Sequence, residues 1–330
     1  MDKETKNIMF IGAGVIGTAL GEILSVKPDL RVTLHSIEKD TVSEINEHHV
    51  NSRCFPTRRL NDRLMATTDD HLLINADLIF LAIPSVVLVD YLQTLRPFLR
   101  PEVQLVNLAK GFGKGNRTIW QCLREEFPNP VSTLKGPSFA REIINHIPTA
   151  FTLGFEHEKQ LQEVTNVFSD TTIFLDHSTD IIGVEILSIL KNMYAIVMGV
   201  IDAQFNSPNL RFMILTKAYR EMRRILIHYG GKEDTMFSYC GYGDFALTAL
   251  NDLSRNRTLG LLIGKGFFTE HISHELVLEG KTAEDIFYKE LSGKIDIDRE
   301  FPIIAELHRL LSSHYEVSEF VKNIIHVTEP

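Results

Sequence analysis

The sequence is poor in cysteine, with three in 330 residues. Cys54, Cys122 and Cys240 are odd in number and far apart, so they do not resemble the paired cysteines of a small secreted protein. Free thiols are typical of reducing compartments. We therefore expect a cytoplasmic protein that is not held together by a disulfide framework.

Positive charge is also scarce. Lys and Arg total 34 against 43 Asp and Glu, which gives a formal net charge of -9. Such a chain repels phosphate backbones, and no local basic patch offsets the average, so we expect no nucleic-acid partner. Internal repeats and low-complexity tracts are lacking as well, which excludes solenoid and low-complexity classes.

An uninterrupted apolar run is missing too. The longest apolar stretch, 181–201, carries Glu185, Lys191 and Asn192 in its interior, where lipid would make ionised groups costly. The charged segment 1–10 has only a short apolar run behind it and is typical of neither a signal peptide nor a lipidation site. We expect a buried helix at 181–201 and no insertion into a membrane.

The residues that are present favour a folded protein of roughly two domains. Hydrophobic residues make up 44% of the chain and charged residues 23%. The first part alternates helix-like segments with strand-like ones at 8–11, 31–34, 76–83 and 103–108. Helical periodicity then dominates 184–200, 213–229 and 259–265. The pattern predicts an α/β domain over 1–180, with a doubly wound parallel sheet, and a mostly α-helical domain over 181–330.

A glycine-rich turn follows the first predicted strand. Gly12, Gly14 and Gly17 fit the G-x-G-x-x-G pattern, in which the backbone amides at a helix start face a pyrophosphate. The alternative is a glycine-rich turn without a ligand. Its place between a strand and a helix favours a Rossmann-type site for NAD or NADP.

The choice between NAD and NADP stays open. The second predicted strand ends near Ser36, where a cofactor ribose would lie, and the first carboxylate after it, Glu38, comes late. No arginine stands there for a 2′-phosphate, although Lys39 is an alternative cation. The balance favours NAD slightly, and no metal site is expected.

Two lysines are candidates for the chemistry. Lys110 directly follows the fourth strand, where side chains face a ligand in open α/β sheets; the alternative is an ordinary loop lysine. Lys191 lies in the apolar helix next to Asn192, and burial would bring its ammonium into the range useful for proton transfer. The alternative is a lysine that extends from the helix edge to water.

Three polar fragments complete the set of candidates. The segments 136–140 and 241–245 combine turn glycines with Ser138 and Asp244. Ser254, Arg255 and Asn256 place a guanidinium beside an amide, which suits phosphate because the guanidinium fork matches phosphate oxygens. Each fragment alone is weak evidence, because turns are rich in these residue types.

In their order along the chain, these fragments resemble the NAD(P)-dependent glycerol-3-phosphate dehydrogenase family. The matching segments are GAGVIGTAL at 12–20, AKG at 109–111, GPSFAREI at 136–143, IGVEILSILKNMYAI at 182–196, CGYGDFALT at 240–248, SRNRTLG at 254–260 and LEG at 278–280. The resemblance covers nearly the whole chain. It implies reduction of dihydroxyacetone phosphate by NADH or NADPH to glycerol 3-phosphate, the reverse oxidation, and a supply of precursor for glycerophospholipid synthesis.

The resemblance also implies a role for each residue. Lys191 transfers the proton, Asp244 holds it by charge, and Asn192 and Thr248 complete the polar site. Lys110 touches cofactor and substrate. The substrate is bordered by Gly136 and Ser138, and its phosphate is clamped by Ser254, Arg255 and Asn256. The implied cofactor residues are Gly12, Gly14, Val15, Ile16, Gly17, Ser36, Lys110, Ala140, Arg255, Val277 and Glu279. The family's usual habit suggests a homodimer.

Several positions depart from the family's pattern. Ile16 stands where the family usually has an aromatic residue, and Ile37 where it often has a basic one, which disfavours NADP. The segment 202–209 lacks the family's glycines, although Asn209, Thr216 and Glu221 still match. Two alternatives follow: a related dehydrogenase of another small substrate, or a nucleotide-binding homologue that has lost turnover.

Overall fold

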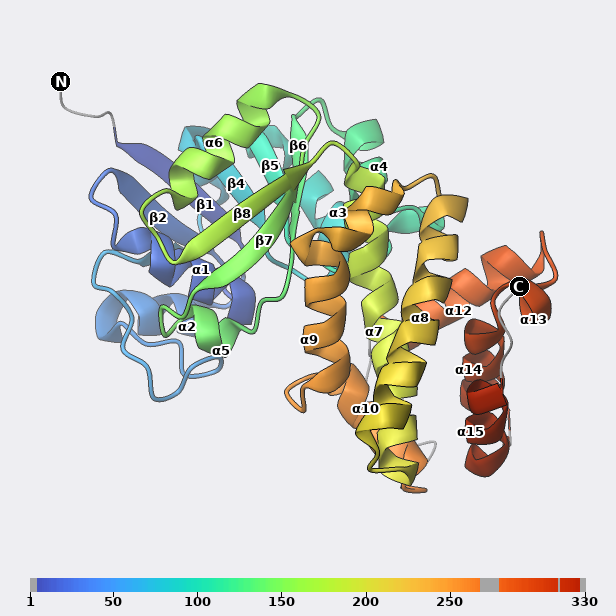
Figure 1. Ribbon diagram of the computed structural model, residues 1–330. Coiled ribbons are helices and arrows are strands. Elements are labelled where there is room, and N and C mark those ends of the chain that lie inside the picture. The colour runs from blue at the N-terminus through green and yellow to red at the C-terminus, as the bar shows by residue number, and fades with distance from the viewer. Residues whose placement is uncertain (1–4, 268–278, 314, 327–330) are drawn as a thin grey trace. The chain divides into compact units, whose positions relative to one another are not determined.

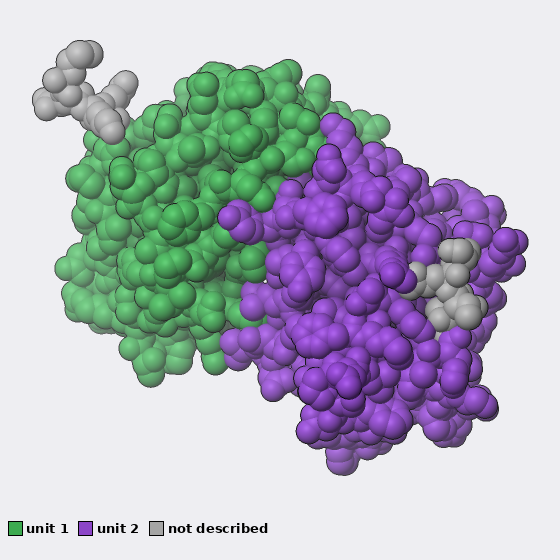
Figure 2. All heavy atoms as spheres, viewed as in Figure 1, with its two compact units in different colours: residues 1–181 green, residues 182–330 purple. Residues whose placement is uncertain are grey.

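The computed structural model describes residues 5–267, 279–313 and 315–326. The chain forms two compact units, 1–181 and 182–330 (Figure 2). Each unit has its own set of elements, which Figure 1 labels along the chain.

Unit 1 is built on an eight-stranded sheet in the order β3-β2-β1-β4-β5-β6-β7-β8 (Figure 1). The strands are β1 (Lys6–Ile11), β2 (Leu30–His35), β3 (Met65–Thr67), β4 (Leu78–Leu81), β5 (Gln104–Asn107), β6 (Val131–Lys135), β7 (Thr149–Gly154) and β8 (Ile173–Ser178). Neighbouring strands are parallel except β6 and β7, which pair antiparallel. The chain leaves β1 toward β2 and returns to its other side as β4. Open sheets bind ligands at the carboxyl ends of strands at such a reversal.

Helices cover both faces of this sheet because successive strand residues point to opposite sides. Their bounds are α1 (Val15–Ser25), α2 (Lys39–Ser43), α3 (Ser85–Leu95), α4 (Ile119–Glu126), α5 (Ala140–Ile143) and α6 (Glu158–Phe168). Ile8 and Phe10 of β1 pack with apolar residues of α1, α5 and α6. Met9 and Ile11 pack with those of α3 and α4. Two cores of alternating residues therefore hold the sheet.

The described residues of unit 2 form helices joined by turns and loops, with no strand among them. Its helices are α7 (Ile181–Gln204), α8 (Pro208–His228), α9 (Asp244–Leu250), α10 (Arg255–Gly264), α12 (Glu279–Ser292), α13 (Ile297–Glu300), α14 (Pro302–Ser312) and α15 (Val317–His326). Helix α7 is long and apolar enough to cross a membrane, but 94% of its most apolar window is buried inside the protein. This burial is typical of a core helix.

The predicted fold class is confirmed: a mostly parallel sheet with helices on both faces, followed by helices. The first strand, the glycine turn and helix α1 lie where the pattern predicts them. Within this mostly parallel sheet, β7 runs antiparallel to β6. Strands β3, β6, β7 and β8 were not predicted, because three-residue strands and strands with polar ends lack a clear alternation of apolar and polar residues.

Candidate active site

In the turn between β1 and α1, two of the glycines are required because a side chain at either position would clash with the backbone. Gly12 has φ of +116°, and a Cβ there would lie 2.6 Å from the carbonyl oxygen of Ala82. A Cβ on Gly17 would lie 2.2 Å from the carbonyl oxygen of Gly12. Only glycine fits at either position, so strand and helix can approach closely.

At Gly14, packing within the protein does not require a glycine. The nearest atom to a Cβ at Gly14 would be the carbonyl oxygen of Ala82, 3.9 Å away, so the protein itself leaves room there. Gly14 is also the N-cap of α1, and among the described side chains none caps that helix. The open backbone and the uncapped amides at a helix start fit a pyrophosphate, which needs close approach and N–H donors.

Other predicted cofactor residues lie on helices α1 and α5. Val15, the first residue of α1, is exposed to 49%. Ile16 and Ala140, the first residue of α5, both pack against the core on the α1 face of the sheet. An aliphatic residue at position 16 therefore serves the packing of unit 1. Val277 lies outside the described residues.

Opposite charges meet just beyond β2. Ser36 accepts a hydrogen bond on its Oγ from the backbone amide of Glu38 at 3.1 Å. The Glu38 carboxylate pairs with the guanidinium of Arg53, whose hydrogen bond holds the pKa of Glu38 below its usual value. Ile37 between them is 76% exposed. A carboxylate and a guanidinium thus lie side by side at the end of β2, and sequence reasoning missed Arg53 because it is 15 residues from Glu38.

Three predicted substrate residues come together where β5 and β6 end. Lys110 follows β5, is half-buried, and donates a hydrogen bond from Nζ to the carbonyl oxygen of Gly136 at 3.3 Å. Ser138 donates from Oγ to the same oxygen at 2.9 Å. Gly136 is tightly held, because a Cβ there would lie 2.5 Å from the carbonyl oxygen of Ala150. Lys110 is therefore part of a built arrangement and not an ordinary solvated loop lysine.

In unit 2, Lys191 is buried beside a carboxylate. It projects from α7 and is 4% exposed, which rules out the alternative of a lysine reaching for water. Its Nζ lies 2.5 Å from Oδ1 of Asp244, the first residue of α9, and donates to Oγ1 of Thr248 at 3.0 Å. Asp244 and Thr248 lie one turn apart on α9, so both can face the same ammonium. The carboxylate favours the charged form of the lysine, which burial opposes.

Asn192 belongs to a second cluster of polar groups. Its Nδ2 donates to Oε2 of Glu279 at 3.0 Å, and Gly280 donates its backbone amide to Oδ1 of Asn256 at 3.2 Å. A Cβ on Gly280 would lie 2.6 Å from the carbonyl oxygen of Asn192. Helices α7, α10 and α12 therefore meet through Asn192, Asn256 and Glu279, all three of which were predicted as site residues.

The start of α10 separates two arginines. Ser254 caps the helix, since its Oγ accepts from the amide of Arg257 at 3.3 Å. Arg257 is buried and pairs with Asp202 at 2.6 Å and with Asp252 at 3.2 Å. Arg255 is exposed and begins the helix. Arg257 therefore stabilises unit 2 through its buried ion pairs, whereas the exposed Arg255 is accessible to an anion.

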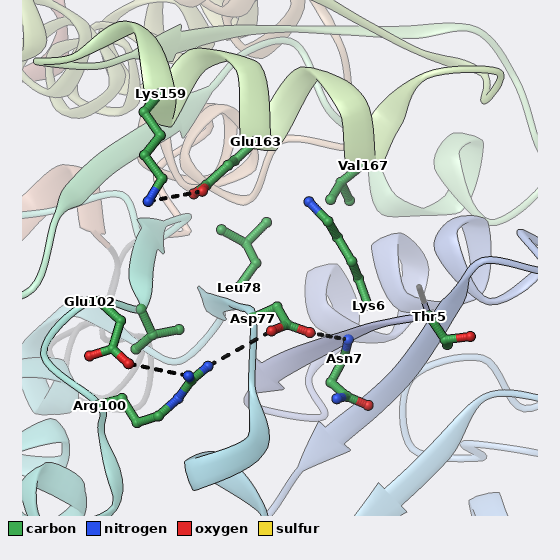
Figure 3. A pocket seen from close by; sticks show the side chains of 11 residues that line it. Thr5, Lys6, Asn7, Asp77, Leu78, Arg100, Glu102, Lys159, Glu163 and Val167 are labelled. Atoms are coloured by element: carbon green, nitrogen blue, oxygen red, sulfur yellow. Dashed lines mark hydrogen bonds and ion pairs between the residues drawn. The ribbon is translucent and has the colours of Figure 1, made fainter. Parts of the chain in front are cut away.

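A hollow of about 410 Å³ lies at the other edge of the sheet, where β1, β4 and β5 begin (Figure 3). Arg100 pairs there with Asp77 at 3.8 Å and with Glu102 at 3.2 Å. Lys159 pairs with Glu163 at 3.7 Å. These charges balance one another, and the hollow is remote from the strand ends that carry the predicted residues. It is not the candidate active site.

Comparisons with known proteins identify the family. The N-terminal model of NAD-dependent glycerol-3-phosphate dehydrogenase matches residues 7–161, and the C-terminal model matches residues 180–322. A protein of Leptospira biflexa named glycerol-3-phosphate dehydrogenase [NAD(P)+] is 33% identical over 96% of this chain and 97% of its own length. One of the same name from Methanothermobacter thermautotrophicus is 36% identical over 78% of this chain and 80% of its own.

A solved structure agrees with the sequence matches. The crystal structure of glycerol-3-phosphate dehydrogenase from Coxiella burnetii matches with a TM-score of 0.88 and 26% identity, over 98% of this chain and 99% of that one. Both family models and both relatives point to the family that the ordered motifs resemble. The chain belongs to the NAD-dependent glycerol-3-phosphate dehydrogenase family.

Proposed function

We propose that this chain is an NAD(P)-dependent dehydrogenase that interconverts dihydroxyacetone phosphate and glycerol 3-phosphate. The observation that carries the proposal is the buried Lys191 ammonium, 2.5 Å from Asp244 and 3.0 Å from Thr248, in a chain whose two halves match the two models of the family. A buried lysine with a fixed carboxylate partner is suited to proton transfer.

The nicotinamide supplies or accepts the hydride when it is bound. Lys191 gives a proton to the substrate oxygen during reduction and takes it back during oxidation. Asp244 favours the protonated lysine, and Thr248 fixes the direction of its Nζ. Asn192 orients the neighbouring polar groups through Glu279. The reaction thus depends on groups whose positions are set by α7 and α9.

Substrate binding relies on cations and backbone groups. Arg255, with Ser254 and Asn256, holds the phosphate, because an exposed guanidinium at a helix start matches phosphate oxygens. Lys110 binds both cofactor and substrate, next to Gly136 and Ser138. Residues 181–330 are accordingly the substrate and catalytic domain.

Residues 1–180 are the dinucleotide-binding domain. The pyrophosphate is bound by the turn of Gly12, Gly14 and Gly17, and the remaining contacts come from Val15, Ile16, Ser36, Lys110, Ala140, Arg255, Val277 and Glu279. Glu38 is available to the ribose hydroxyls of NAD, and Arg53 to the 2′-phosphate of NADP. Because the two side chains are adjacent, the site offers a group to either cofactor. NAD is slightly favoured, because Ile37 stands where a basic residue would bind the 2′-phosphate of NADP.

The wider setting follows from the product. Glycerol 3-phosphate is a building block of glycerophospholipids, so the enzyme supplies their synthesis. It acts in the cytoplasm, where reduced thiols persist. It forms a homodimer, as the family usually does. The small molecule on which it acts is a phosphorylated substrate.

The test is oxidation of NADH and of NADPH, followed by absorbance, with dihydroxyacetone phosphate and, separately, with phosphate-free dihydroxyacetone. We expect oxidation with the phosphorylated substrate only, and faster with NADH. Oxidation without the phosphate would contradict the role of Arg255. No oxidation of a cofactor that the protein demonstrably binds would contradict the proposed activity.

A further inference from the structure

A second lysine of unit 1 is fully buried. Lys135 is the last residue of β6 and is 0% exposed. Its Nζ donates to the carbonyl oxygen of Asn107 at 3.0 Å and to that of Ala109 at 2.7 Å. Asn107 ends β5, and Ala109 directly precedes Lys110. The ammonium of Lys135 therefore binds the backbone on which Lys110 is carried.

The contact is reciprocal. Lys110 donates from Nζ to the carbonyl oxygen of Gly136, the residue that follows Lys135. Each lysine thus binds a carbonyl group adjacent to the other lysine. Strands β5 and β6 pair in parallel, with Asn107 opposite Thr133, so the two connections leave the same edge of the sheet. The segment that carries Lys110 is held from both directions.

Other bonds fix the same segment. Thr133 donates from Oγ1 to the carbonyl oxygen of Asn107 at 3.3 Å, and Oδ1 of Asn107 accepts from the amide of Ala109 at 2.9 Å. Burying an ammonium costs free energy unless its hydrogen bonds are made. A neutral side chain could fill this position of β6 at a smaller desolvation cost. Packing alone therefore does not explain why a charged residue stands at position 135.

We propose that Lys135 is a positioning residue that fixes the segment 108–111 and thereby sets the place of the Lys110 ammonium. The proposal rests on the proposed function in one respect, the role of Lys110 toward cofactor and substrate. An error of about 1 Å in such a group can cost on the order of a hundredfold in rate. Lys135 acts through Lys110 and does not itself touch cofactor or substrate.

The first variant is Lys135→Met, which keeps an unbranched side chain as far as Cε and removes the ammonium group with its charge and donors. The matched control is Lys27→Met. Lys27 is also buried, and its Nζ donates to the carbonyl oxygens of Asn166, Val167 and Ser169 at 3.1, 3.1 and 2.8 Å. It has the same chemistry in the same unit but does not hold a predicted site residue. Both variants lose buried hydrogen bonds, and only Lys135→Met disturbs Lys110.

Hydrogen exchange measured by mass spectrometry tests positioning without any activity. We expect amide exchange over 108–111 to be at least tenfold faster in Lys135→Met than in the unmodified protein and unchanged in Lys27→Met. Unchanged exchange over 108–111 in Lys135→Met would overturn the proposal. This readout stands even if the chain fails to reduce dihydroxyacetone phosphate, which would overturn only the proposed function.

Kinetics test the consequence through a double-mutant cycle. We expect Lys135→Met to lower kcat/KM at least tenfold and Lys27→Met to leave it within about twofold. In a Lys110→Met background, adding Lys135→Met should cost less than twofold more, because the group it positions is already gone. An equal loss in both backgrounds, or no loss in either, would show that Lys135 does not act through Lys110.

Discussion

Lys191 and Arg255 occupy opposite environments in unit 2. The lysine is 4% exposed and bound to Asp244, whereas the arginine is exposed at the start of α10. A desolvated ammonium suits proton transfer to a developing alkoxide, and an exposed guanidinium suits capture of a phosphate from water. Their burial alone therefore predicts different kinetic phenotypes for their loss.

Replacing Lys191 by Met should abolish turnover while leaving cofactor affinity intact. Removal of a positioned acid–base group costs roughly 10²- to 10⁴-fold in rate. The measurements are kcat with dihydroxyacetone phosphate and NADH binding by fluorescence titration. Lys322→Met removes an exposed lysine of α15 and is the control for lost charge. Near-normal kcat in Lys191→Met would remove Lys191 from the mechanism.

Replacing Arg255 by Ala should mainly raise KM for dihydroxyacetone phosphate. A hydrogen bond to a charged group contributes ~1.5–3 kcal/mol, which corresponds to a rise of roughly tenfold to a hundredfold. Arg257→Ala is the contrasting variant, because it leaves the buried Asp202 without one of its two arginines. It should lower stability, but by less than the about 3–5 kcal/mol of a buried charge left without any partner, because Arg211 still pairs with Asp202. If Arg255→Ala left KM unchanged, the phosphate would be held elsewhere.

At the scale of elements, unit 2 depends on a close crossing of α7 and α10. A Cβ on Gly260 would lie 2.0 Å from the carbonyl oxygen of Ile196, and one on Gly199 would lie 2.2 Å from that of Arg257. The two backbones are therefore in direct contact. The crossing matters for the site because α7 carries Lys191 and α10 begins with Arg255.

Gly260→Ala should force these helices apart. Overpacking of a filled interior costs about 1–3 kcal/mol, and the shift would also reduce kcat/KM because Lys191 and Arg255 lie on the displaced helices. Gly293→Ala is the matched control, since the nearest atom to its added Cβ would be 3.7 Å away. Chemical denaturation gives the stabilities. Equal stabilities of the two variants would contradict a tight crossing.

The same elements show what a sequence can predict. The glycine turn was predictable because a buried strand, three spaced glycines and a helix occur within a single stretch, 8–24. The contact of Lys191 with Asp244 spans 53 residues, and only the family resemblance indicated it. Lys135 and Arg53 gave no signal, because a lysine in a strand and an arginine in a loop look ordinary until the fold places carbonyl groups or a carboxylate beside them.

For the molecule as a whole, a buried carboxylate links pH to stability. Glu221 of α8 accepts a hydrogen bond from the hydroxyl of Tyr194 of α7 at 2.8 Å. It also accepts from the amides of Ile303 and Ile304 at the start of α14, both at 2.9 Å. Burial raises the pKa of Glu221 to about 7 despite these bonds, which favour the charged form. Helices α7, α8 and α14 therefore meet at one titrating group.

The direction of the effect follows from proton binding. Between the ordinary value of 4.5 and about 7, the unfolded chain releases the Glu221 proton while the folded protein keeps it. The free energy of unfolding therefore falls as pH rises through this window. The contribution of Glu221 is fully present below pH 4.5 and is lost above about 7, a change of up to ~3 kcal/mol.

Glu221→Gln should remove this slope and leave those of other groups in place. Urea unfolding measures the free energy of unfolding of the unmodified protein and of the variant. The difference between the two values should shrink by up to ~3 kcal/mol between pH 4.5 and 7. Glu319→Gln, which removes an exposed carboxylate of α15, controls for net charge. A difference between the unmodified protein and Glu221→Gln that stayed constant with pH would mean that Glu221 is ionised throughout. Its two bonds to the start of α14 would then outweigh its burial.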